Sequence, residues 1–222
     1  MANVELNALW YNALKIMARL AEKYENKQLC RKYLEMAEKT KKSFAEKFYN
    51  AGKHCLYDVL GDSKVRPNQL FALSLSHPIV DNAEIAEQVL STVENKLLNK
   101  YGLKTLSSDE DGYVDVYEGS AYKRDSSYHQ GITWPWLLGL YYDALKNTMI
   151  IEKNRTKRQE LEEKITKLVY TTKETFKAEM FERSSIGTIS EIYDSTEPYE
   201  ERGAFAQAWS VAEIFRIVLN KR

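Results

Sequence analysis

Thr133–Tyr142 reads TWPWLLGLYY, and this stretch decides the fold that we expect. It begins a helix with almost no polar face, which is typical of a helix that is buried on all sides. Thr156–Met180 predicts the opposite kind of helix, because an apolar stripe runs along one side while lysines and glutamates cover the rest. A buried helix next to a half-exposed helix indicates two layers of helices.

The remaining sequence continues this alternation. Apolar residues at helical spacing, a proline suited to a first turn and a capping-box pattern at Asp81–Glu84 predict further helices at residues 4–24, 29–48, 68–76, 81–97 and 204–219. In the last of these, Trp209 and Phe215 belong to the apolar stripe. We therefore expect an all-α chain of about six helices in two concentric layers, as in an α/α toroid. An irregular helical bundle or a solenoid is the alternative.

The composition excludes several classes of protein. The chain has 32 basic and 32 acidic side chains, so its charge favours neither nucleic acid nor an anionic membrane surface. No apolar run reaches the roughly 18 residues that a membrane span needs. Cys30 and Cys55 are the only cysteines, which excludes a disulfide framework and favours a reducing, cytoplasmic location. The 15 tyrosines and 4 tryptophans suit sugar rings, but they also suit the walls of a helical fold.

Residues 101–130 form the longest stretch without helical periodicity. The stretch contains several acidic residues interleaved with Tyr113, Tyr117, Tyr122 and Tyr128. A loop of this length in a compact domain is usually either functional or disordered. The tyrosines argue against disorder, so we expect a functional loop.

Glu191 is the first candidate for chemistry. It lies in GTISEIYD (Gly187–Asp194), which we expect to be a loop between two long helices, with Tyr193, Asp194 and Tyr199 close by. Hydrolysis of a glycosidic bond commonly takes two carboxylic residues, and in inverting enzymes they lie roughly 6.5–9.5 Å apart to admit a water. A carboxylate before a helix is more commonly a plain cap or a solvated charge, so Glu191 alone is weak evidence.

A second cluster, YHQGITWPW (Tyr128–Trp136), begins the buried helix. His129 and Gln130 are able to hydrogen-bond sugar hydroxyls, and Trp134 is able to stack on a sugar. The alternative is that the tryptophans are core residues and His129 caps the helix. Glu5, at a helix start, has a similar ambiguity, and so does the pairing of Asp58 with residues 66–69.

Metal and nucleophile chemistry find no support. The three histidines are scattered, and no pair of potential metal ligands has a suitable spacing. Neither a Gly-x-Ser-x-Gly elbow nor a phosphate-binding Gly-rich loop is present. We therefore expect no metal and no cofactor.

Five motifs, taken together, resemble one family. In the same order and spacing, they are similar to the C-terminal amylo-α-1,6-glucosidase domain of glycogen debranching enzymes, and they cover nearly the whole chain. The motifs are VELNALWYNAL (4–14), RPNQLFALS (66–74), GLKTLS (102–107), YHQGITWPW (128–136) and GTISEIYD (187–194).

The resemblance implies an (α/α)6 toroid with an inverting glucoside-hydrolase site at its mouth. The general base of this clan is a glutamate before the last inner helix, and Glu191 matches that position. The motif positions that would line the glucose-binding subsite are Glu5, Tyr128, His129, Gln130 and Trp134. The implied partner is an α-glucan, either glycogen or a limit dextrin.

One departure from the family changes the expected function. The family barrel has twelve helices, whereas about half that number are predicted here, so residues 1–222 resemble a single domain that is the C-terminal part of the catalytic domain, with the N-terminal half missing. The family's general acid, an aspartate, lies upstream of the Glu5 motif. We therefore expect the chain to hold the base without the acid and to hydrolyse little alone.

Exposed helix edges predict a further partner, because large apolar patches usually associate. We expect either self-association or an N-terminal half-barrel partner. Three other functions stay open: a non-catalytic glucan-binding module, a purely structural helical interaction protein, or another toroidal glycosidase such as a glucoamylase or an α-glucosidase.

Overall fold

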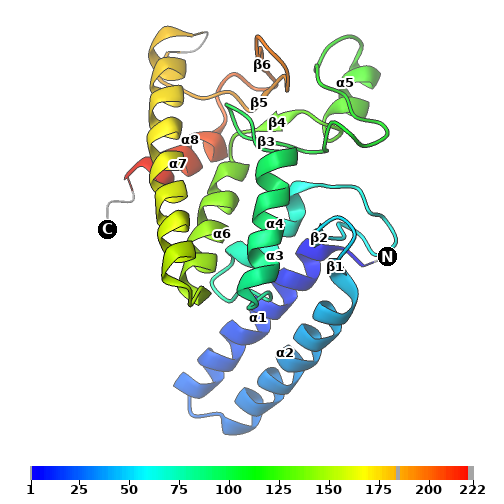
Figure 1. Ribbon diagram of the computed structural model, residues 1–222, viewed down its shortest axis with the longest axis vertical. Helices are drawn as coiled ribbons and strands as arrows, with labels where there is room; N and C mark the ends of the chain where they lie inside the picture. Colours follow the sequence, from blue (N-terminus) through cyan, green and yellow to red (C-terminus); the bar gives the residue numbers. More distant parts are fainter. Residues whose placement is uncertain (1, 184–185, 220–222) are drawn as a thin grey trace.

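The structure, a computed structural model, describes residues 2–183 and 186–219 of the chain. Its helices form two rows (Figure 1). Successive helices contact one another along the inner row, which consists of α1 (Val4–Lys23), α3 (Phe71–Ser74), α6 (Leu137–Ile151) and α8 (Ala208–Leu219). The outer row packs against it and consists of α2 (Lys27–Phe48), α4 (Ala83–Lys96) and α7 (Arg155–Glu182). The expectation of an all-α chain in two layers is confirmed.

The contrast between α6 and α7 is confirmed as well. Most of the first three turns of α6 is buried, including Tyr141, Tyr142 and Leu145. The buried side of α7 recurs every three or four residues, from Leu161 to Glu179, and most of the other residues of that helix are exposed. Because α7 covers the helical core on one side only, it needs just one apolar stripe.

Three predicted helix boundaries were wrong. The helix that we expected to begin at Thr133 begins at Leu137, because Thr133–Trp134 pairs as strand β4 and a residue before proline disfavours helical angles. The last helix begins at Ala208 instead of Ala204, since the backbone of Ala204 bonds to that of Glu191.

The predicted helix at residues 68–76 is a 3-10 turn, Pro67–Leu70, followed by the single turn of α3. The stretch from residue 101 to 130 is also more regular than expected, because it contains strand β3 (Leu103–Lys104) and helix α5 (Ala121–Ser127). Ser120 caps α5 by accepting a hydrogen bond from the backbone of Lys123.

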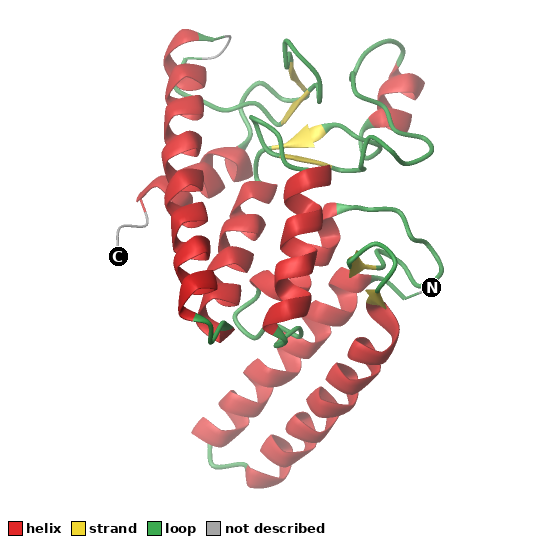
Figure 2. Ribbon diagram, in the orientation of Figure 1, coloured by secondary structure: helices red, strands yellow, loops and turns green. Residues whose placement is uncertain are grey.

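Among the described residues, six two-residue strands form two small antiparallel sheets. Strands β1 (Tyr49–Asn50) and β2 (Cys55–Leu56) pair as one hairpin. The larger sheet has the order β3-β4-β5-β6, in which β5 (Ile192–Tyr193) lies between β4 and β6 (Glu201–Arg202). This sheet and the long loops gather at one end of the helices (Figure 2), so segments far apart in sequence meet there.

Helix α1 has two apolar faces, and only one of them is covered. Its buried face repeats every three or four residues and consists of Val4, Ala8, Tyr11, Leu14, Ala18 and Ala21. The opposite face is apolar and exposed, and consists of Leu6, Leu9, Trp10, Ile16, Met17 and Leu20.

Helix α8, at the other end of the inner row, behaves in the same way. Its buried residues are Ser210, Ile214 and Ile217, whereas Trp209 and Phe215 from the predicted stripe are exposed. Both ends of the row therefore present apolar faces to the outside. No helix among the described residues is long and apolar enough to cross a membrane.

Candidate active site

Glu191 sits at the start of the β5–β6 hairpin, and the hairpin itself holds its carboxylate. The backbone N–H of Glu191 donates to the carbonyl of Ala204 at 2.9 Å, and the N–H of Ala204 donates to Glu191 Oε2 at 3.0 Å. Gly203 makes this closeness possible: a Cβ at this position would lie 2.3 Å from Glu191 Oε2, and its φ of +69° suits glycine.

Two side chains hold the other carboxylate oxygen. The hydroxyl of Tyr128 donates a hydrogen bond to Glu191 Oε1, and Gln207 Nε2 donates to the same atom at 3.3 Å. Burial and the neighbouring carboxylate raise the pKa of Tyr128, so the phenol stays protonated and remains a donor. Glu191 is half-buried and is fixed by three donors from two segments of the chain, around residue 128 and at residues 204–207.

His129 and Trp134 form a stacked pair next to Glu191. Their rings lie 5.5 Å apart with an angle of 14° between the planes, and the ring of Tyr128 packs edge-on against Trp134. Trp134 is only 4% exposed, so it supports the exposed ring of His129 from below. Partial burial and the positive charge of Arg66 lower the pKa of His129, while Glu191 acts in the opposite direction. A neutral imidazole is able to both donate and accept a hydrogen bond.

Two further tryptophans extend this aromatic surface. Trp209, which is 45% exposed, packs edge-on against Trp134 and stacks on Trp136 with ring centres 5.3 Å apart. Sequence reasoning assigned Trp209 to the core, because its spacing in the last helix is the same as that of a buried residue. Only the position of α8 at the end of the row leaves its ring open.

Arg66 connects the second and fourth motifs. Its guanidinium donates to the carbonyl of His129 at 2.7 Å, to the carbonyl of Thr105 at 3.1 Å and to Gln130 Oε1 at 2.9 Å. The side chain of Gln130 therefore contacts Arg66, and the Arg66 contact in turn fixes the backbone that carries His129.

Glu5 belongs to a second acidic group at the start of α1. Its Oε1 accepts a hydrogen bond from Asn3 at 3.5 Å, and its buried Oε2 has no hydrogen-bond partner among the described residues. Asp58 accepts a bond from Asn68 at 3.0 Å. Burial raises the pKa of Asp58, the charge of Glu5 adds to this rise and Arg66 opposes it.

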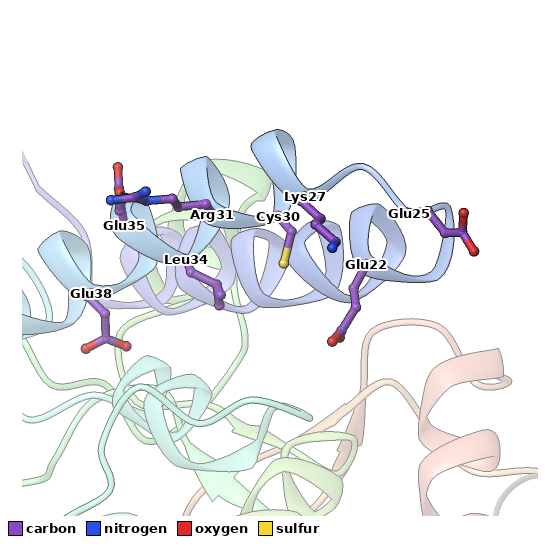
Figure 3. A pocket seen from close by; sticks show the side chains of 8 residues that line it. All are labelled: Glu22, Glu25, Lys27, Cys30, Arg31, Leu34, Glu35 and Glu38. Atoms are coloured by element: carbon purple, nitrogen blue, oxygen red, sulfur yellow. Dashed lines mark hydrogen bonds and ion pairs between the residues drawn. The ribbon is translucent and has the colours of Figure 1, made fainter.

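No cluster of three or more potential metal ligands occurs within residues 2–183 and 186–219. A hollow of about 1040 Å³ lies far from Glu191. It lies between the distal ends of α1 and α2, where the side chains of Glu22, Glu25 and Glu38 splay outward and Arg31 pairs with Glu35 (Figure 3). Glu191 is instead half-buried, beside the exposed residues His129 and Ala204.

A sequence model of the amylo-alpha-1,6-glucosidase family matches residues 2–216. The chain belongs to this family. Its fold is similar to that of two solved structures. One is a sialidase, with a TM-score of 0.70, 13% identity, and coverage of 96% of this chain and 19% of the sialidase. The other is the neutral trehalase Nth1 from Saccharomyces cerevisiae, with a TM-score of 0.64, 16% identity, and coverage of 98% of this chain and 37% of the trehalase.

Family membership agrees with the geometry. The two rows of helices are part of a toroid of the kind found in this group of glycosidases, as the resemblance predicted. This amylo-alpha-1,6-glucosidase family chain spans less than two fifths of either solved structure. Of the site residues named from the sequence, the fold brings Tyr128, His129 and Trp134 to Glu191. Gln130 and Glu5 lie at the Arg66 and Asp58 side of the same end.

Proposed function

We propose that this chain supplies the general base of a glycosidase that hydrolyses α-1,6-glucosidic branch points of glycogen or a limit dextrin with inversion. The observation that carries the proposal is the Glu191 carboxylate, which Tyr128, the Ala204 N–H and Gln207 hold beside an aromatic surface. A carboxylate with a fixed orientation beside an open face is placed to take a proton from an attacking water.

The reaction needs a second carboxylic group on the opposite side of the scissile bond. In an inverting enzyme Glu191 removes a proton from water, the resulting hydroxide attacks the anomeric carbon, and the general acid protonates the departing oxygen. We place that acid outside residues 1–222, as the family resemblance implies. Glu191 then requires a partner segment that brings the acid to roughly 6.5–9.5 Å from it.

Aromatic rings beside Glu191 support a sugar ligand. The exposed faces of Trp209 and His129 are suited to stacking on the apolar side of a glucose ring, and the polar edge of His129 is suited to its hydroxyls. No cofactor takes part in this scheme. We place the protein in the reducing cytosol, because Cys30 and Cys55 are both free thiols.

The exposed face of α1 supports a helical partner. Exposed, mostly apolar residues recur along it at alternating intervals of four and three: Leu6, Trp10, Ala13, Met17, Leu20 and Tyr24. This spacing is the one that packs along another helix. At the other end of the row, an apolar groove of about 300 Å³ lies between α7 and α8 and is lined by Met180, Phe181, Ile214 and Phe215.

We propose that an N-terminal half-barrel covers both ends of the inner row and closes the ring around Glu191. A second copy of this chain is the alternative occupant. Either arrangement removes large apolar surfaces from water, which favours association. Only the half-barrel also supplies the missing general acid.

The test is reconstitution. The chain is mixed with, or fused to, a segment that carries the remaining helices of the toroid, and glucose release from a limit dextrin is measured. We expect turnover in the mixture and a loss of at least about 10²-fold with Glu191→Gln, which keeps the shape but cannot accept the proton. Glu200→Gln is the matched control, because Glu200 is exposed on the same hairpin. Full activity of Glu191→Gln would contradict the assignment of the base.

A glucan-binding module without turnover is the second candidate function. The observation that favours it is that the aromatic surface of Trp209, Trp136 and His129 is assembled within this chain alone. This function requires saccharide binding with no glucose release, even when the other helices are present. The reconstitution experiment therefore separates the two functions.

A further inference from the structure

A buried acid on α7 holds the hairpin that carries Glu191. Glu179 is only 4% exposed, and its Oε1 accepts a hydrogen bond from the hydroxyl of Tyr193 at 2.8 Å. Tyr193 is fully buried in β5, two residues after Glu191. The contact therefore links α7 to the strand that directly follows Glu191.

Arg183, the residue directly after α7, holds the other strand of the same hairpin. Arg183 Nε lies 2.7 Å from Glu201 Oε1 in β6 and 3.6 Å from Glu179 Oε2. Tyr193 and Glu201 are directly paired across the hairpin. Glu179 and Arg183 therefore contact both members of one cross-strand pair. Arg183 also donates to the hydroxyl of Tyr101 at 2.6 Å, and the ring of Tyr101 stacks on Tyr193.

The alternate residues of the hairpin are held from elsewhere. Arg202 makes two bonds to Asp194 Oδ2, at 3.0 and 2.8 Å, and Asp194 Oδ1 accepts the backbone N–H of Tyr117 at 2.8 Å. Successive residues of a strand point to opposite sides. The loop before α5 therefore holds one side of the hairpin, and α7 holds the other.

The charges on the α7 side do not balance without a proton. Two carboxyl groups, Glu179 and Glu201, face one guanidinium, and Glu179 Oε2 is buried with no hydrogen-bond partner among the described residues. One guanidinium neutralises only one of the two carboxylates, and burial disfavours the charged form of the other, so a proton on this pair is favoured. The other groups at this cluster are the phenols of Tyr193 and Tyr101 and the ammonium of Lys100, which lies over the Tyr101 ring. A buried ion pair of this kind is weak evidence for a stabilising role, because apolar residues of similar volume would fill the space without the cost of removing charges from water.

We propose that Glu179 and Arg183 are positioning residues for Glu191, and that their contacts with the β5–β6 hairpin depend on a proton held by the carboxyl pair of Glu179 and Glu201. With the proton in place, the hairpin keeps the Ala204 N–H and the Glu191 carboxylate in register. When the proton leaves, the carboxylates of Glu179 and Glu201 repel each other between α7 and β6, and the hairpin opens more often. The inference rests on the proposed function only in assigning the base role to Glu191.

Hydrogen–deuterium exchange tests the contacts of Glu179 and Arg183 with the hairpin without requiring turnover. Protection of residues 189–204, corrected for the intrinsic exchange rate, is compared at pH 5.5 and pH 8 in the wild type and in Glu179→Gln. Glutamine still accepts the Tyr193 bond and cannot ionise. We expect protection in the wild type to fall on the order of tenfold between these pH values and to stay constant in Glu179→Gln. Glu182→Gln, an exposed change on the same helix, is the control and should follow the wild type.

Two further variants complete the test. Tyr193→Phe removes the hydroxyl and keeps the ring, so it should lower hairpin protection at pH 5.5. If Tyr193→Phe does not fold, Arg183→Lys takes its place, because lysine keeps the charge and lacks the several N–H donors of the guanidinium. Equal pH dependence in the wild type and Glu179→Gln would overturn the proposal. Absence of glucose release after reconstitution would count against the proposed function and leave this exchange result unaffected.

Discussion

The hydroxyl of Tyr128 donates a hydrogen bond to the carboxylate of Glu191, across 63 residues of sequence. Tyr128 precedes strand β4 and Glu191 precedes strand β5, and the two strands are neighbours in the small sheet. The pairing of Thr133 with Tyr193 sets the register between the two segments. The relative position of base and aromatic surface therefore depends on a sheet of only four short strands.

Tyr128→Phe should weaken the site more than it weakens the fold. A hydrogen bond to a charged group contributes about 1.5–3 kcal/mol. Without it, the Glu191 carboxylate keeps its other donors but is less firmly oriented. We expect glucose release by the reconstituted enzyme to fall about tenfold or more. Tyr122→Phe, a change of an exposed tyrosine in α5, should have no effect. Equal activity of the two variants would argue against a role for the Tyr128 hydroxyl.

Gly203→Ala should destabilise the hairpin by about 2–3 kcal/mol, since it adds a clash with Glu191 Oε2 to the strain of a positive φ. Urea unfolding measures the effect. Gly112→Ala separates the two causes: Gly112 has φ +88° and nothing within 4 Å of an added Cβ. This control should cost only about 1 kcal/mol. If Gly203→Ala were no less stable than Gly112→Ala, the side chain of Glu191 would have to move away from the added Cβ at little cost in free energy.

The buried acid pair predicts an unusual dependence of stability on pH. Burial, reinforced by Glu201, raises the pKa of Glu179 from 4.5 to about 6, although the Tyr193 bond and Arg183 act in the opposite direction. An acid with a raised folded-state pKa stabilises the fold fully below its unfolded pKa and loses that contribution as the pH rises through the folded value.

The free energy of unfolding should therefore fall by about 1–2 kcal/mol between pH 4.5 and pH 7 through this group. Thermal unfolding across this range, in the wild type and in Glu179→Gln, isolates the contribution. As the pH rises, the stability of the wild type should fall relative to that of Glu179→Gln. A constant difference at every pH would show that Glu179 does not bind the proton.

Charged substitutions on the open face of α1 should abolish association without reducing stability. Trp10, which is 51% exposed, and Leu20 lie on that face, so replacing both by glutamate removes no buried contact. We expect light scattering to report association for the wild type and a monomer for the double variant. Arg19→Glu, on the same helix, is the control and should still associate. A wild type that is a monodisperse monomer would contradict the prediction.

Trp209→Ala should weaken saccharide binding, because the exposed ring offers a stacking face at the site. We expect isothermal titration with an α-1,6-branched oligosaccharide to show an affinity about tenfold lower, which corresponds to about 1.4 kcal/mol. Tyr170→Ala removes another exposed aromatic ring, on α7, and should bind like the wild type. If both variants bind equally well, Trp209 is not part of the sugar surface.

Local pattern predicted much of the helical framework. The apolar run of α6 and the single stripe of α7 reflect how many sides of each helix are covered, and such coverage leaves a direct record in the spacing of residues. The site was less visible. Gln207 and the Ala204 N–H hold Glu191 but carry no recognisable motif, because their roles come from a hairpin whose strands are only two residues long.

The sequence by itself determined the all-α class, the order of five motifs and the family to which they belong, since periodicity and motif order are properties of the chain alone. Tertiary structure decided the rest. The residues 133–134 became a strand because partners on both sides offered backbone bonds that a helix there would forgo. Trp10 and Trp209 are exposed because a helix with two apolar faces does not specify which face its own chain will cover; only the packing of the whole inner row decides that.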